Sequence, residues 1–151
     1  NVVNSMKFTP ELIFKDTNIN KIRINNADTA SIIKGVNIIK SLSKFDIGQS
    51  VVINNGYVLA IEGPEGTDET IKRSSHLLKK YKLKNKSILI KFPKANQDLR
   101  VDLPTIGLDT IKNCIKANIK GIAVKRSQNI ILDKDKIINL TKKNNFFIIS
   151  L

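Results

Sequence analysis

The residues best suited to chemistry gather between Lys91 and Thr105, in the stretch KFPKANQDLRVDLPT. This stretch holds the following polar side chains: Lys91, Lys94, Gln97, Asp98, Arg100 and Asp102. Loops longer than about 12 residues in compact domains are usually functional or disordered. A mixture of cations and carboxylates is what phosphate and metal chemistry require. We therefore expect this loop to be central to the function.

A second group of carboxylates follows the strand-like run Tyr57–Ile61, and consists of Glu62, Glu65 and Asp68. In open α/β sheets, ligands bind beyond the carboxyl ends of the strands. If the strands that end at Ile61 and Lys91 are neighbours, the two groups of carboxylates face each other across a crevice. Clustered carboxylates repel unless a cation or a proton lies among them.

This arrangement suits Mg²⁺, which proteins usually hold by one or two carboxylates together with a substrate phosphate. Lys91, Lys94 and Arg100 are placed to hold the phosphate oxygens. The pattern thus favours phosphoryl chemistry by metal-activated water. The carboxylates follow no metal-binding signature with fixed intervals, so spacing alone is a weak indication.

Each of these residues also has a purely structural interpretation. Thr67 and Asp68 are suited to capping a helix, and Glu62 and Glu65 to a solvated surface. Asp102 and Arg100 could form an ion pair inside a turn, and Asp46 could cap a turn through Gly48. Cys114 fits a buried core position, and His76 an exposed helix position.

Composition limits the classes of function. The chain has 151 residues, of which 41% are hydrophobic, enough for one domain with a real core. One cysteine and one histidine exclude an internal disulfide and any site with two histidine ligands. The net charge of +13 is compatible with nucleic acid or an anionic membrane. Arginine, which nucleic-acid binders use heavily, is scarce, so nucleic acid is an unlikely partner.

Alternating strand and helix patterns predict an α/β fold, a single domain with helices packed on a mixed sheet. Asn54-Asn55-Gly56 predicts a β-hairpin between 50–53 and 57–61. Further strands are expected at 87–91, 121–125, 129–132 and 146–150. Helices are expected at 29–44, 68–81, 109–118 and 133–143, with Asp28 and Asp133 as N-caps. Residues 1–27 are poorly patterned, and we expect the domain to span residues 28–151.

Several motifs together resemble the C-terminal domain of the LpxI family: DIGQSVV (46–52), AIEGPEGTDETIKR (60–73), QDLRVDLPTIG (97–107), GIAV (121–124) and LTKKNNFFII (140–149). These enzymes are UDP-2,3-diacylglucosamine pyrophosphatases of lipid A biosynthesis in Gram-negative bacteria. The resemblance implies Mg²⁺-dependent hydrolysis of the diphosphate, with water attack on the uridine-side phosphorus. The products would be UMP and 2,3-diacylglucosamine 1-phosphate (lipid X).

The resemblance also implies roles for individual residues. The family's key acidic residue lies in the DLP motif, which here is Asp102. Asp102 is therefore expected to be catalytic and to bind the metal, with Asp68 and Glu65 in supporting catalytic and metal-binding roles. The residues expected to bind substrate or phosphate are Lys91, Lys94, Gln97, Arg100, Asp46, Gln49 and Thr67.

The partners and the location follow from the same resemblance. Family members carry an N-terminal Rossmann-like domain, and the ligand lies between the two domains. Residues 1–27 are too few to form that domain, so we expect them to be a linker or a truncated remnant. The resemblance further implies a homodimer in the cytoplasm, in peripheral contact with the inner membrane. The alternatives are a non-catalytic basic binding module for nucleic acid or anionic membrane, and a folded remnant without activity.

Overall fold

The Asn55-Gly56 turn joins the first two strands, β1 (Ser50–Asn54) and β2 (Tyr57–Ile61), into an antiparallel hairpin. The structure, a computed structural model, describes residues 12–94 and 103–151. The hairpin is confirmed, and both of its turn residues have the positive φ angles that Asn-Gly turns favour.

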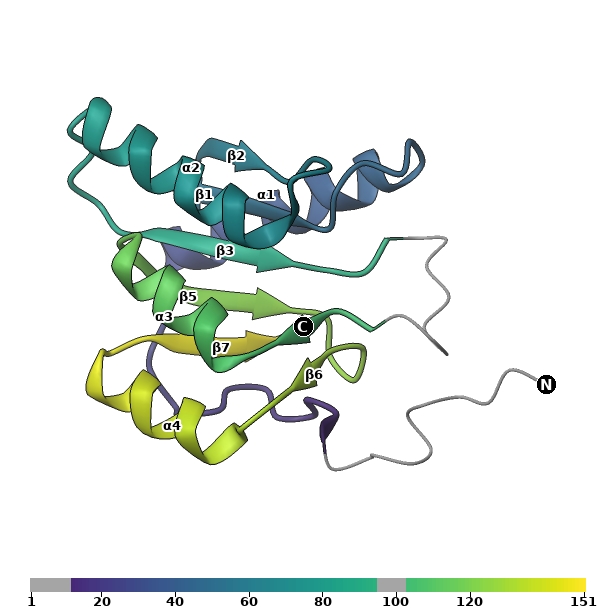
Figure 1. Cartoon of the computed structure of the whole chain (residues 1–151), viewed down its shortest axis with the longest axis vertical. Coiled ribbons are helices and arrows are strands. Elements are labelled where there is room, and N and C mark those ends of the chain that lie inside the picture. The colour runs from purple at the N-terminus through teal and green to yellow at the C-terminus, as the bar shows by residue number, and fades with distance from the viewer. Residues whose placement is uncertain (1–11, 95–102) are drawn as a thin grey trace.

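The hairpin forms one side of a five-stranded mixed sheet with the order β2-β1-β3-β5-β7 (Figure 1). Strand β1 pairs antiparallel with β3, whereas β3, β5 and β7 are parallel to one another. The remaining strands of this sheet are β3 (Ser87–Lys91), β5 (Ile119–Val124) and β7 (Phe147–Ser150). The short strands β4 (Thr105–Ile106) and β6 (Ile130–Ile131) form a separate parallel pair. The predicted single α/β domain with a mixed sheet is confirmed.

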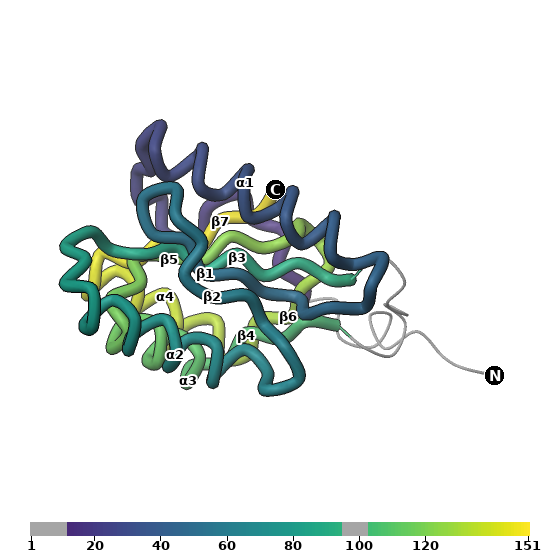
Figure 2. The backbone as a smooth tube through the Cα atoms, turned by 90° about the horizontal axis from the view of Figure 1, so that it is seen from above, coloured from purple at the N-terminus to yellow at the C-terminus, as the bar shows by residue number. Residues whose placement is uncertain are grey.

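Helices cover both faces of the sheet, which explains why its central strands are apolar on both sides. Helix α1 (Asn26–Ser43) lies alone on one face (Figure 2). The other face carries α2 (Gly66–Lys80), α3 (Leu108–Lys116) and α4 (Lys134–Lys143). Two cores result, one under α1 around Ile32, Ile53 and Ile90, and one under the other helices around Leu89, Ile111 and Ile122.

Helix α1 begins earlier than its sequence pattern suggests. Asn25 is the N-cap, and its side chain accepts a hydrogen bond from the backbone N–H of Asp28 at 2.8 Å. The prediction that Asp28 is the cap is therefore wrong, because Asp28 occupies the third helical position of a capping box. Asp133 does occupy the N-cap position of α4, but it makes no side-chain capping hydrogen bond.

The described part of the N-terminal segment packs on the domain. Phe14 is buried in the core beneath α2, α3 and α4. Asn18 forms an antiparallel bridge with Ile149 on the outer edge of β7. Ile13, Phe14 and Asn18 thus contact the rest of the domain.

Candidate functional site

The candidate site lies at the edge of the sheet where β2 and β3 end. These two strands are not neighbours, because β1 runs between them in the opposite direction. The crevice expected between their loops required the two strands to be neighbours, so this expectation is wrong. Instead, the first residue of β1 connects the two strand ends: Ser50 is paired with Lys91, and its carbonyl accepts the Glu62 N–H at 2.9 Å.

Glu62 is the central carboxylate of this edge. It is only 6% exposed, and its Oε2 atom accepts hydrogen bonds from Ser50 Oγ at 2.5 Å and from Thr67 Oγ1 at 2.8 Å. Burying a carboxylate is costly unless hydrogen bonds replace its lost hydration. The two hydroxyl groups provide these bonds, so the solvated-surface interpretation of Glu62 is wrong.

The loop after Glu62 leads directly into α2. The helix begins at Gly66, and Glu65 occupies the N-cap position without a side-chain capping bond. Thr67 and Asp68 therefore lie in the first turn, and the prediction that one of them caps the helix is wrong. Thr67 points back to Glu62, and Asp68 is exposed at the positive end of the helix dipole.

Glu65 is paired with side chains of α2. Its Oε1 atom accepts a hydrogen bond from Arg73 Nη2 at 2.7 Å and another from Thr70 Oγ1 at 3.3 Å. Its own backbone N–H and the Arg73 guanidinium lower the pKa of Glu65. Arg73 also donates to the Ile61 carbonyl, so this ion pair joins α2 to the end of β2.

Lys91, at the end of β3, is a cation buried beneath the loops of the site. It is 7% exposed, and its Nζ donates to the Thr105 carbonyl at 3.4 Å. Burial raises the pKa of the nearby Cys114 thiol, the charge of Asp68 raises it further, and the charge of Lys91 opposes the rise. Cys114 is a fully buried core residue, as predicted.

Lys94 and Asp46 connect the beginning of the long loop to the loop that follows α1. Lys94 Nζ donates to Asp46 Oδ1 at 2.8 Å and to the Asp46 carbonyl at 3.1 Å. Because Asp46 has a φ of +57°, the chain turns sharply at this point. This contact holds the segment that leads through Gly48 to Gln49 and Ser50.

Gln49 carries a buried side-chain oxygen, Oε1, for which the structure shows no hydrogen-bond partner among residues 12–94 and 103–151. Its backbone carbonyl accepts the Phe92 N–H at 2.9 Å, which fixes the main chain beside β3. An unsatisfied buried amide oxygen costs roughly 1–3 kcal/mol. A hydrogen-bond donor on a bound ligand would remove this cost.

The other predicted residues lie outside the described residues: Gln97, Asp98, Arg100 and Asp102. Ser50, which contacts Glu62, was not among the predicted site residues. No local pattern singles out this serine, because its role depends on the pairing of β1 with both β2 and β3.

The described residues contain no group of three or more Asp, Glu, His or Cys side chains that could hold a metal ion. Mg²⁺ usually needs only one or two protein carboxylates, because phosphate and water complete its ligands. The exposed Asp68 is available to supply one such carboxylate. Glu65 is engaged with Arg73 and would first have to leave that ion pair.

The fold and this sheet edge define a single α/β domain with a cluster of polar residues at the carboxyl ends of β2 and β3. The chain belongs to the LpxI C-terminal domain family, whose profile matches residues 15–149. It is 32% identical over 125 residues to UDP-2,3-diacylglucosamine pyrophosphatase LpxI of Caulobacter vibrioides. The matched region covers 81% of this chain and 45% of that relative, so the chain spans about half the length of the curated relative.

Proposed function

We propose that this chain is the C-terminal half of a Mg²⁺-dependent hydrolase that cleaves the diphosphate of UDP-2,3-diacylglucosamine. Water would add to the uridine-side phosphorus and the bond to the bridging oxygen would break, giving UMP and 2,3-diacylglucosamine 1-phosphate. The observation that carries the proposal is the meeting of Lys91, Ser50 and Glu62 at one sheet edge, in a chain of the LpxI family.

The residues at this edge suit a diphosphate ligand. Lys91 supplies positive charge from a buried position, where solvent screens it less. Gln49 offers an acceptor to a hydroxyl or N–H group of the ligand. Glu62 accepts a hydrogen bond from the Thr67 hydroxyl in the first turn of α2. This bond positions the N-terminus of α2 beside the site.

Asp68 and Asp102 would hold Mg²⁺, with Glu65 in a supporting role. The bound ion would supply an activated water and neutralise charge on the phosphate oxygens. Lys94, Arg100 and Gln97 would contact the phosphates from the long loop. Lys94 already joins the start of that loop to Asp46.

A separate N-terminal domain is the expected partner of this chain. The relative from Caulobacter vibrioides has more than half of its length outside the matched region, which leaves room for such a domain. We further propose that the enzyme acts in the cytoplasm, at the surface of the inner membrane from which its lipid substrate comes. None of the helices in residues 12–94 and 103–151 is long and apolar enough to cross a membrane.

The test is hydrolysis of UDP-2,3-diacylglucosamine with Mg²⁺, followed by chromatography of UMP and lipid X. The 151-residue chain is assayed alone and after addition of an N-terminal domain of the family. Turnover that appears only with both parts indicates a site shared between two domains. Absence of turnover in both assays would refute the proposed function.

Asp102→Ala is the decisive variant, and Asp109→Ala is its matched control because Asp109 is an exposed aspartate paired with Lys112 on α3. We expect Asp102→Ala to lower kcat by at least about a hundredfold and Asp109→Ala to leave it unchanged. Normal hydrolysis by Asp102→Ala would exclude the role given to this residue.

A further inference from the structure

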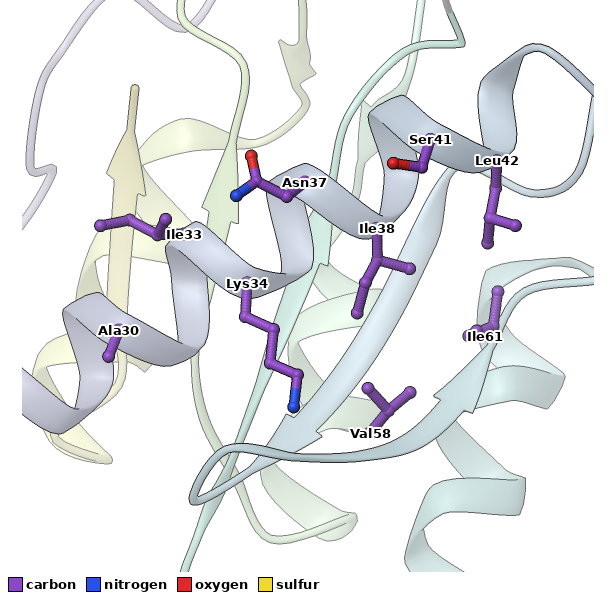
Figure 3. A pocket seen from close by; sticks show the side chains of 9 residues that line it. All are labelled: Ala30, Ile33, Lys34, Asn37, Ile38, Ser41, Leu42, Val58 and Ile61. Atoms are coloured by element: carbon purple, nitrogen blue, oxygen red, sulfur yellow. The ribbon is translucent and has the colours of Figure 1, made fainter.

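An apolar groove runs between α1 and β2, on the face of the sheet opposite α2 (Figure 3). Its volume is about 830 Å³. The side chains that line it come from α1 and β2 and are mostly aliphatic: Ala30, Ile33, Lys34, Asn37, Ile38, Ser41, Leu42, Val58 and Ile61. Lys34 is its one charged lining residue, and its Nζ donates to the Gly56 carbonyl at the hairpin turn.

One end of the groove lies at the end of β2, one residue before Glu62. Leu42 and Ile61 line this end, and Lys34 lies toward the opposite one (Figure 3). Ile61 directly precedes Glu62, and its carbonyl accepts the hydrogen bond from Arg73. Phe45 and Ile47, which follow α1 in the chain, also have exposed apolar side chains. Apolar and polar surfaces therefore meet at the end of β2.

The shape of β2 argues against a peptide strand as the occupant. Strand β2 is at the edge of the sheet, where another strand could in principle pair with it. However, Val52 pairs with Ala60 and Ile53 with Val58, so Leu59 is an extra residue that forms a bulge. Bulges twist edge strands and hinder the addition of a further strand.

The dimensions and chemistry of the groove fit a hydrocarbon chain. Twelve residue steps separate Ala30 from Leu42, which corresponds to about 18 Å along the helix axis. The lining offers few polar partners, so a ligand must bind through the apolar surface that it buries. The substrate named for the relative carries two acyl chains next to its diphosphate.

We propose that this groove binds a fatty acyl chain of the substrate, with the sugar and the diphosphate held beyond Ile61 at the site around Glu62. This proposal rests on the proposed function for the identity of the ligand. It assigns acyl recognition to α1 and β2, on the opposite face of the sheet from α2.

The test uses fluorescence to measure how binding of a probe to the 151-residue protein depends on the probe's hydrocarbon chain. The probe is dansylundecanoic acid, and dansylglycine, which lacks the hydrocarbon chain, is the reference. The groove variant is the double substitution Ile33→Thr with Val58→Thr, which keeps β-branched side chains of similar size. The control is Leu132→Thr, because Leu132 is 42% exposed and Val58 is 38% exposed.

We expect the undecanoic probe to bind and dansylglycine to bind much more weakly, since each buried methylene raises affinity about fourfold. The groove variant should bind the probe about tenfold more weakly, and Leu132→Thr should bind it as the wild type does. Thermal melts of all three proteins check folding, and Val58→Thr alone serves as a second variant with a smaller effect in the same direction.

The acyl proposal would be overturned if the wild type, the groove variant and Leu132→Thr bound the probe equally well. It would also be overturned if dansylglycine bound as tightly as the undecanoic probe. A dimer that excludes the probe, and that the groove variant dissociates in size-exclusion chromatography with light scattering, would also overturn it in favour of a second copy of the chain. Probe binding that depends on the groove, together with no hydrolysis of UDP-2,3-diacylglucosamine either by the chain alone or after addition of the N-terminal domain, would refute only the proposed function.

Discussion

The hydroxyl group of Thr67 donates a hydrogen bond to Glu62 Oε2 at 2.8 Å, and thereby connects the first turn of α2 to the end of β2. Ser50, from β1, donates to the same oxygen atom. One buried carboxylate thus joins two strands and a helix at the site, and this arrangement determines where the N-terminus of α2 lies.

Replacing Glu62 should therefore destabilise the domain. Glu62→Ala leaves the buried Ser50 hydroxyl and the half-buried Thr67 hydroxyl without their acceptor. We therefore expect the free energy of unfolding to fall by about 2 kcal/mol in urea titrations. Glu69→Ala is the control, because the Glu69 side chain is 56% exposed and pairs with the exposed Lys72 on the same helix. Its effect should stay below about 0.5 kcal/mol. Equal effects of the two substitutions would show that the hydrogen bonds to Glu62 contribute no stability.

Gly48 should tolerate no side chain. Its φ is +47°, and a Cβ atom there would lie 2.1 Å from the Glu62 carbonyl oxygen. Strain and overlap together should make Gly48→Ala less stable by at least about 3 kcal/mol. Gly56→Ala is the matched control, since Gly56 also has positive φ but would place its Cβ in open space. Thermal unfolding of Gly48→Ala measures the effect of steric overlap together with backbone strain, and that of Gly56→Ala measures strain alone. Similar losses of stability in the two variants would contradict the close approach of Gly48 to the Glu62 carbonyl.

The ion pair between Glu65 and Arg73 should make stability depend on pH in the acid range. Because the pKa of Glu65 is lowered in the folded state, the stabilisation is fully present above the usual value of 4.5. It is lost as the pH falls through the lower folded-state pKa. Glu65→Gln should therefore narrow the stability difference between neutral and acid pH, as measured by urea titrations at several pH values. A parallel pH dependence in Glu65→Gln and in wild type would argue against this linkage.

Cys114 should be inert in the native protein. Its thiol is fully buried, and burial is the main cause of its raised pKa, so little reactive thiolate forms at neutral pH. We expect Ellman's reagent to modify Cys114 only after unfolding in guanidinium chloride. Leu132→Cys introduces an exposed thiol as a positive control, and one equivalent should react at once in that variant. Rapid modification of Cys114 without denaturant would mean that the core around α3 opens readily.

Local patterns in the sequence predicted most of the secondary structure. The Asn-Gly turn, the apolar spacing of α1 and the continuous apolar run of β3 each reflect short-range preferences that the fold retains. Motif likeness likewise indicated the family that the profile match establishes over residues 15–149. These features are readable because they depend on neighbours in the chain.

Tertiary structure alone decided how the predicted site residues come together. Strand β1 separates β2 from β3, so Glu62 and Lys91 approach the site from either side of Ser50. The same packing buried Glu62 with two hydroxyl groups and directed Glu65 toward Arg73. Strand order, and therefore the surroundings of each carboxylate, depends on contacts between residues far apart in the sequence, which no local pattern records.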